Sequence, residues 1–398
     1  MVYQIEESRF EIIPTISGRA AVKGSRIYSV YAGITRYTDD YGETYVDLQN
    51  NLPAYSQDYY VHIAKSGTMI VSKTRQVFRS VYPYTNFTNV VNLSTTGSYI
   101  NTWGFTEDSD GVLYLSEYGN YKMVGETSFT NVLLWYKSTN DGLSWTKYTN
   151  LQDKDTKHIH QIKVNPYTQV LYATTGDAYK RLFKSHNKGE NWEEVIPTNF
   201  PDKTSQNINY GGFTGVGFYP DGTILWGTDW QPTNNGTYWN WHTKSKGHDV
   251  NSFTYKKMEK RYYGFSGEIV TDPTTGEAWN MVRDEFGEDD VVSAVMYSQD
   301  YGNTWTPLVE TPTISTMQMG TILRTEENFI PDFPYIFLDV MNHGVVRFPR
   351  NLKPIPPPVK SDQIKTASFY QNINGEIVEV DIFYGGVNLS VLNVFLGE

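Results

Sequence analysis

Acidic side chains close several strand-like segments of this sequence. Glu117 ends Tyr-Leu-Ser-Glu, Asp177 ends Thr-Thr-Gly-Asp, and Asp229 ends Trp-Gly-Thr-Asp. Paired carboxylates can give a proton to a glycosidic oxygen or take one from an attacking water. These residue types therefore indicate chemistry at a sugar.

Two histidines extend this set. His158 and His160 stand two positions apart, which places both imidazoles on one side of a strand. Such a pair suits a general acid or base, a polar channel lining or a metal ion, and metal is the least favoured because no third ligand is evident. The predicted catalytic residues are Glu117, His160, Asp177 and Asp229, with no metal and no cofactor.

Other residues are predicted to hold the sugar. Aromatic faces stack on sugar rings, while charged groups bind hydroxyls or a carboxylate. These candidates are Trp103, His158, Trp230, Tyr263, Arg283, Asp284 and Asp339. The competing interpretation is structural, because an acidic residue at a strand end commonly caps a turn.

A recurring phrase shows which elements position these residues. Four segments fit S/T-x-D/N-x-G-x-(T/S/N)-(W/Y), and strand-like runs flank each of them: 38–45, 138–145, 185–192 and 298–305. The Asp or Asn can accept hydrogen bonds from turn amides, the Gly supplies a positive φ, and the last aromatic residue inserts between sheets. The phrase is therefore a hairpin turn, and we call it the repeat turn.

The spacing of the repeat turns predicts the architecture. Their glycines stand at 42, 142, 189 and 302, so two of the intervals (100, 47 and 113) are near twice the third. Degenerate copies fit the gaps at 77–91 and 241–250, and a seventh strand of the same kind lies at 344–348. Units of this length with four short strands are typical of β-propeller blades. We expect an all-β propeller of seven blades, with six as the alternative.

Each blade should run outward from the centre of the ring. Inner strands are expected near 19–22 and at 60–64, 102–106, 158–164, 212–218, 264–270 and 317–323. Second strands should follow at 26–31, 69–72, 112–116, 170–174, 224–228, 278–282 and 336–340, and residues 3–13 should close the ring on the last blade. Loops that follow second strands and loops that join blades open on one face, where the candidate residues should converge.

The repeat turns resemble those of the Asp-box, or BNR, family. That family includes sialidases, other sugar-cleaving propellers and propellers that only bind, and the resemblance covers about residues 15–352. Its sialidases carry an Arg-Ile-Pro segment and an arginine triad. No Arg-Ile-Pro occurs here, and Arg283 alone stands where a triad member could sit. The resemblance thus implies the fold without implying a classical sialidase.

Composition excludes other classes. A net charge of -11 and the absence of a basic run exclude nucleic acid as a partner. With no cysteine there is no disulfide or thiolate site, and no run approaches the ~18 apolar residues of a membrane span. The first ten residues do not form a signal peptide, and an extracellular or virion-associated location is favoured.

The chain should divide at a proline-rich segment. Residues 1–352 form the predicted propeller, 353–359 a stiff linker, and 360–398 a small β appendage. Asn374-Gly375 predicts a hairpin turn between 368–373 and 376–383. Such an appendage suits docking to a particle or homo-oligomerisation.

Three functions remain open at this level. The leading interpretation is a propeller that recognises a glycan, such as the receptor-binding protein of a bacteriophage tail. The second is a glycoside hydrolase or polysaccharide lyase that acts on a cell-surface or extracellular glycan at the same face. The third is a structural assembly protein, for which the acidic face has no role.

Overall fold

The 398-residue chain is described by a computed structural model. The structure describes residues 11–13, 19–54, 59–94, 98–100, 103–118, 133–151, 158–176, 181–196, 213–229, 231–232, 238–239, 241–247, 250, 252–262, 265–283, 292–311, 318–325, 327, 329–341, 344–352, 364–373 and 376–385. The chain divides into two compact units, Met1–Pro354 and Ile355–Glu398.

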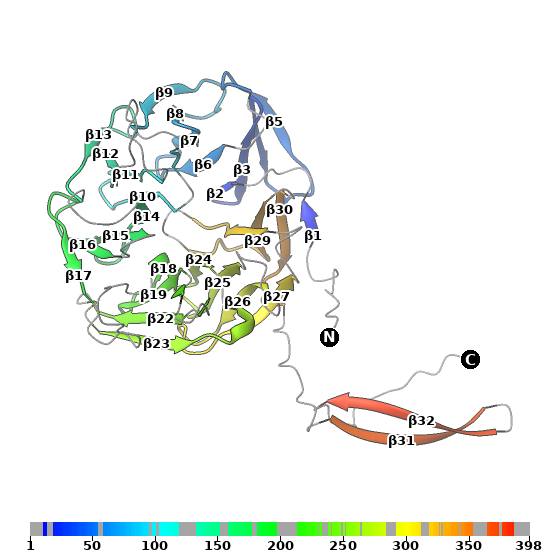
Figure 1. The fold of residues 1–398 in the computed structure, drawn as a ribbon. Coiled ribbons are helices and arrows are strands. Elements are labelled where there is room, and N and C mark those ends of the chain that lie inside the picture. The colour runs from blue at the N-terminus through cyan, green and yellow to red at the C-terminus, as the bar shows by residue number, and fades with distance from the viewer. Residues whose placement is uncertain are drawn as a thin grey trace. The chain divides into compact units, whose positions relative to one another are not determined.

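The first unit is a ring of seven four-stranded antiparallel sheets (Figure 1). The predicted β-propeller with seven blades is confirmed. Blades 1 to 3 consist of β2 (Ala21–Lys23), β3 (Arg26–Tyr31), β4 (Ile34–Thr38) and β5 (Val46–Gln49); β6 (Tyr60–Ile63), β7 (Met69–Lys73), β8 (Gln76–Ser80) and β9 (Thr88–Asn92); and β10 (Phe105–Glu107), β11 (Leu113–Ser116), β12 (Trp135–Ser138) and β13 (Thr146–Tyr148).

Blades 4 to 7 follow in chain order around the ring. They consist of β14 (His158–Val164), β15 (Leu171–Gly176), β16 (Leu182–Ser185) and β17 (Glu193–Val195); β18 (Phe213–Phe218), β19 (Thr223–Thr228), β22 (Trp241–Lys246) and β23 (Phe253–Lys257); β24 (Phe265–Thr271), β25 (Ala278–Arg283), β26 (Ser293–Ser298) and β27 (Thr306–Thr311); and β28 (Gln318–Ile322), β29 (Tyr335–Met341), β30 (Gly344–Pro349) and β1 (Glu11–Ile13). Blade 5 carries an extra pair, β20 (Gln231–Pro232) and β21 (Tyr238–Trp239), and a 3-10 turn, η2 (Lys260–Tyr262), precedes blade 6.

The N-terminal strand closes the ring. β1 pairs antiparallel with β30, Glu11 opposite Arg347 and Ile13 opposite Val345, as expected for the described part of 3–13. The Arg347 guanidinium bonds to Glu11 of β1, to the Tyr41 carbonyl oxygen at 2.8 Å and to Glu43. One side chain thus ties together the last blade, the N-terminal strand and the repeat turn of blade 1.

The repeat turns are hairpin turns between third and fourth strands. In each, the Asp or Asn accepts a bond from the amide four residues on, as from Thr44 to Asp40 at 2.8 Å. The turn glycines have positive φ and abut the preceding blade. A β-carbon on Gly189 would stand 2.3 Å from the Trp135 ring of blade 3. Glycine is therefore required both for its φ and for the close approach.

The two degenerate copies are hairpins as well. Residues 77–91 span β8 and β9, and Tyr84 has φ +63 where the other turns have glycine. The copy in blade 5, at 241–250, begins with β22 and keeps Gly247 at φ +78. The backbone thus retains the left-handed residue even where the sequence pattern has decayed.

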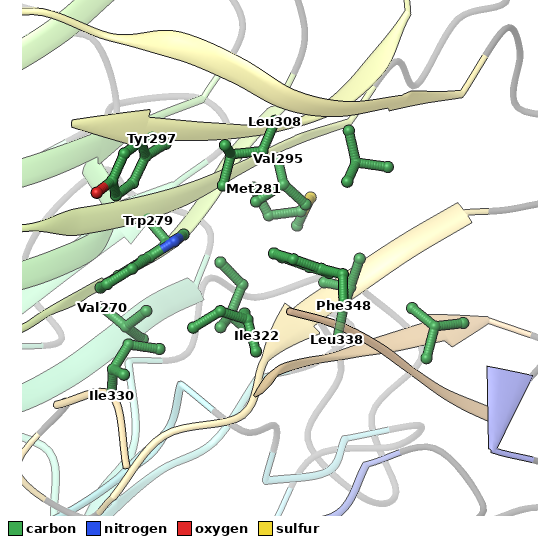
Figure 2. Packing of buried hydrophobic residues seen from close by; sticks show 13 residues of the cluster. Val270, Trp279, Met281, Val295, Tyr297, Leu308, Ile322, Ile330, Leu338 and Phe348 are labelled. Atoms are coloured by element: carbon green, nitrogen blue, oxygen red, sulfur yellow. The ribbon is translucent and has the colours of Figure 1, made fainter. Parts of the chain in front are cut away.

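Apolar residues fill the space between neighbouring blades. Figure 2 shows the contact of blade 6 with blade 7, where Trp279, Val295 and Leu308 meet Leu338 and Phe348. All five are buried. A blade leaves both sheet faces apolar, and stacking in a ring covers them.

The described part of the second unit is a hairpin. β31 (Ile364–Ile373) pairs with β32 (Glu376–Gly385) over ten residue pairs, with Ile373 opposite Glu376. This register joins the strands through residues 374–375, where the sequence predicted the turn; those two residues, and the linker 353–359, lie outside the described residues. Within the described residues, no helix has the length and apolar character needed to cross a bilayer.

Candidate functional site

An arc of side chains lies where inner strands begin, at one end of the ring. Tyr60 is the first residue of β6, and its ring stacks on Tyr99 with centroids 5.2 Å apart. Tyr99 contacts Tyr118 at 5.4 Å, and Tyr118 contacts His158 at 4.4 Å. The Arg19 guanidinium covers Tyr60 at 4.1 Å. We call Arg19, Tyr60, Tyr99, Tyr118, His158 and His160 the mouth arc.

A β-bulge sets the position of His160. β14 and β15 shift register between Ile159 and Gln161, so His160 is the extra residue. Its ring lies 5.0 Å from that of His158, centroid to centroid, and directly over Gly176 of β15. Bulges commonly re-aim a side chain beside a functional site. The predicted pair of imidazoles is thus held together on the arc, next to Tyr118.

Asp339 is far from the mouth arc in sequence, but its charge acts on Tyr60 of the arc. It belongs to β29 of blade 7 and is buried. Burial raises the pKa of Tyr60, and the charges of Tyr99 and Asp339 raise it further while Arg19 opposes them. The Tyr60 phenol therefore keeps its proton at physiological pH and can donate a hydrogen bond to a ligand oxygen.

Glu117 is buried within blade 3. Its carboxylate accepts bonds from Ser98 Oγ and the Tyr136 hydroxyl, each at 2.8 Å. Burial and the Glu117 charge raise the pKa of Tyr136, which keeps this phenol a donor. These contacts brace the segment entering blade 3 against β12. The proposed catalytic role of Glu117 stays a prediction.

The remaining described candidates take separate positions. Asp229 follows β19 and is buried, and Arg283 ends β25 opposite Phe265 and is half-buried. Trp103 lies in a turn before β10 rather than in the expected inner strand, which begins only after Gly104. Its half-buried indole packs against the apolar cluster of blades 6 and 7, although Trp103 itself enters blade 3. The indole therefore reaches across the ring.

Four candidates, Asp177, Trp230, Tyr263 and Asp284, lie outside the described residues. Their roles remain predictions from the sequence. Among the residues that the structure describes, no group of three or more His, Asp or Glu side chains could hold a metal ion.

Below the arc, charged side chains meet inside the ring. Glu268 of β24 is fully buried and bonds to Arg324 Nε at 2.8 Å. Lys163 Nζ of β14 lies 3.6 Å from the same carboxylate and donates to the Phe105 carbonyl oxygen at 2.9 Å. Gln161 Nε2 donates a hydrogen bond to the Glu268 carboxylate at 3.4 Å. We call Gln161, Lys163, Glu268 and Arg324 the channel network.

The connection from β28 to β29 crosses the far end of the channel. Its Glu327 pairs with Lys65 of blade 2 at 3.5 Å, and its Phe329 contacts Tyr167 of blade 4. The Ile330 amide donates to the Thr271 carbonyl oxygen of blade 6 at 3.0 Å. One segment of blade 7 thus reaches three other blades, at the end where inner strands finish. The mouth arc lies at the opposite end.

Comparison with solved structures places this ring among known propellers. The ring is a seven-bladed β-propeller, and the solved structures below have a similar fold. An ancestral GH74 enzyme matches with a TM-score of 0.55 at 12% identity, over 96% of this chain and 51% of that one. YCF48 bound to D1 peptide matches with a TM-score of 0.51 at 14% identity, over 88% of this chain and 100% of that one. PorZ, a surface component of the type-IX secretion system of Porphyromonas gingivalis, matches with a TM-score of 0.53 at 9% identity. The match covers 92% of this chain and 54% of that one.

These matches establish the fold. The chain spans about half the length of the GH74 enzyme and of PorZ. No protein-family model matches the sequence, and no curated protein matches it significantly. The identity values are too low to carry an activity from one propeller to another.

Several residues of the site were not predicted. Tyr60 opens an inner strand that the sequence did predict, so its position at the mouth was available from the pattern. Tyr118 directly follows Glu117 and faces the histidines instead. Lys163 and Glu268 are charged residues within predicted inner strands. Such a placement is unusual for a buried strand and is a usable signal for a channel-lining group.

Proposed function

We propose that this protein is a carbohydrate-recognising propeller, related to the Asp-box family, that binds a glycan at the mouth arc. The observation that carries the proposal is the continuous series of ring contacts from Tyr60 through Tyr99 and Tyr118 to His158, which come from blades 2, 3 and 4. Aromatic rings with polar tips are the groups that bind the apolar faces and the hydroxyls of a sugar.

The polar groups of the arc suit a hydroxyl-rich ligand. The Tyr60 phenol stays protonated, Arg19 supplies donors, and Asp339 nearby supplies an acceptor. Donors on the arc and an acceptor beside it suit sugar hydroxyls, since each hydroxyl both donates and accepts. A nucleic acid remains an unsuitable partner for a chain of net charge -11.

A second candidate function is hydrolysis or lyase cleavage of the bound glycan. The imidazoles of His158 and His160 lie 5.0 Å apart, and a buried carboxylate, Asp339, belongs to the same end of the ring. The propeller fold is compatible with such an enzyme, since a GH74 enzyme has a similar fold. His160 would then act as the general acid or base.

The biological setting we propose is the tail of a virus that infects bacteria. The second unit, a ten-pair hairpin on a proline-rich linker, would dock the propeller to the particle or to further copies. A purely structural assembly role is the remaining alternative. It predicts that no glycan is retained.

The test is a panel of immobilised cell-wall and capsular polysaccharides. Retention of the protein is measured together with new reducing ends and unsaturated ends. Tyr118→Ala should lower retention at least about tenfold, as for an aromatic residue at a binding hot spot. The matched control is Tyr82→Ala, because Tyr82 is 63% exposed in the turn of blade 2 at the other end of the ring.

The outcomes separate the functions. Retention without products supports the recognition module, and products that His160→Ala abolishes support the enzyme. Equal retention of the wild type, Tyr118→Ala and Tyr82→Ala would exclude the mouth arc as the site. No retention on any glycan favours the assembly role.

A further inference from the structure

A small cavity lies beside the channel network, between blades 7, 1 and 2. Its volume is about 40 Å³. Its polar lining comes from His62, Glu268, Thr321, Arg324 and Thr325, and the rest is apolar, including Val61, Ile63 and Leu323. A water needs roughly 10–15 Å³ measured in this way, so the space holds a few water-sized groups.

The charges around this cavity do not balance. Below about pH 7, where the Lys163 amine is protonated, Arg324 and Lys163 are both cationic, and one carboxylate, Glu268, lies between them. Lys163 and Glu268 are buried, and the Arg324 side chain is 11% exposed. Burial limits the screening of this excess of positive charge by water, and an unbalanced interior charge is costly. The region is therefore a favourable place for a negative charge.

His62 gives an independent sign that a group is expected here. The residue is 5% exposed, and its ring stacks on Phe105 with centroids 4.9 Å apart. Its Nε2 atom, on a residue that lines the cavity, has no hydrogen-bond partner among the described residues. A buried imidazole nitrogen without a partner is uncommon in a folded protein.

We propose that this cavity is a binding site for a small monovalent anion of about the size of chloride, and that His62 takes up a proton when the anion enters. The anion would offset the second cation of the channel network. It would accept a hydrogen bond from protonated Nε2 and lie against the apolar walls. A water molecule satisfies the hydrogen bond but leaves the charge unbalanced.

The groups that face His62 determine the pH dependence. Arg324 beyond β28 and Lys163 of β14 disfavour its protonation, and burial is the largest cause of the lowered pKa of His62. The hydrogen bond to the Ile100 backbone favours protonation, and the carboxylate of Glu268 of β24 also lines the cavity. An anion in the cavity would oppose the two cations. Anion binding should therefore strengthen as the pH falls, by up to about tenfold per unit where one proton is taken up.

The experiment compares salts of equal ionic strength on the full chain. The thermal unfolding midpoint is measured in sodium chloride, sodium bromide and sodium gluconate at pH 6 and pH 8. We expect chloride and bromide to raise the midpoint above gluconate, more at pH 6. Crystals grown in bromide should show an anomalous peak in the cavity. Equal midpoints in all three salts, or an empty cavity in bromide, would overturn the proposal.

Two variants separate the parts of the site. Arg324→Gln removes the excess cation and should abolish the advantage of halide over gluconate, while Lys188→Gln, a lysine on an outer turn, should keep it. His62→Gln cannot take up a proton and tests the coupling even if Arg324→Gln fails to fold. It should show a smaller gain in halide binding from pH 8 to pH 6 than the wild type, because only Lys163 can then take up a proton. A full gain at pH 6 in His62→Gln would exclude the proposed proton uptake.

Discussion

The imidazole of His160 occupies the space that a side chain on Gly176 would need. An ideal β-carbon on Gly176 would stand 1.7 Å from both Cε1 and Nε2 of that ring. The bulge in β14 turns His160 onto β15, and the glycine leaves room for it. The bulge and the glycine together therefore position the His160 imidazole at the mouth arc.

Gly176→Ala should therefore displace His160. We expect a loss of about 1–3 kcal/mol in the free energy of unfolding, because extra volume is forced into a packed site. Glycan retention should fall with it if the mouth arc is the binding site. Urea unfolding measures the first effect. In the double variant Gly176→Ala/His160→Ala the clash is removed, so stability should partly recover, and a purely additive loss would contradict the assigned contact.

The glycine of a repeat turn is predicted to be harder to replace than an open turn glycine. Gly189→Ala places a β-carbon 2.3 Å from the Trp135 ring at φ +81. We expect it to cost about 2–4 kcal/mol, through strain and overpacking together. Gly67→Ala is the matched control, with φ +90 and no atom within 4 Å, and should cost about 1 kcal/mol. Equal losses in urea unfolding would show that packing between blades contributes nothing here.

Ring closure should depend on Arg347. Its side chain is 11% exposed, but Glu11 and Glu43 are mostly exposed, so we discount the ion pairs for solvent screening. Arg347→Ala should lower the free energy of unfolding by about 1–2 kcal/mol and speed amide exchange in β1. Arg26→Ala removes a pair with Asp39 inside blade 1. It should leave exchange in β1 unchanged.

Lys163 should make the free energy of unfolding rise as the pH increases above about 7. Burial, and secondly the Arg324 charge, lower the pKa of Lys163 from 10.5 to about 7. Between pH 7 and 10.5 the unfolded chain therefore holds a proton that the folded chain has lost. Stability from this group falls as the pH drops through that window and is constant below it.

Lys163→Met should remove this slope. The wild type minus variant difference in free energy of unfolding should rise by up to about 1.4 kcal/mol per pH unit between pH 7.5 and 10. Lys246→Met is the control, because Lys246 is 73% exposed. A flat difference for Lys163→Met would mean that the amine stays charged in the ring.

The sequence predicted those features that local pattern determines. β14 has the predicted bounds His158–Val164, and residues 374–375 join strands in the predicted register. Alternating apolar residues and turn glycines, which are local in sequence, determine these strand bounds and this register. The bulges at His160 and in β24 beside Glu268 were not predictable, because they depend on what the adjacent strands and blades present.

The channel network shows the same limit at longer range. Gln161 and Glu268 stand 107 positions apart, and only the closed ring brings them together. A single charge in a strand indicates a lining position but not its partner. The same holds for Trp103, whose contact with blades 6 and 7 depends on the diameter of the ring.

The pairing of β1 with β30 also fixes the order in which the molecule can be completed. Glu11 leaves the ribosome 336 residues before its partner Arg347. The first strand must therefore wait, exposed, through the synthesis of every blade. Deleting either end of the propeller would leave an open edge on blade 7, where a strand from another molecule could add.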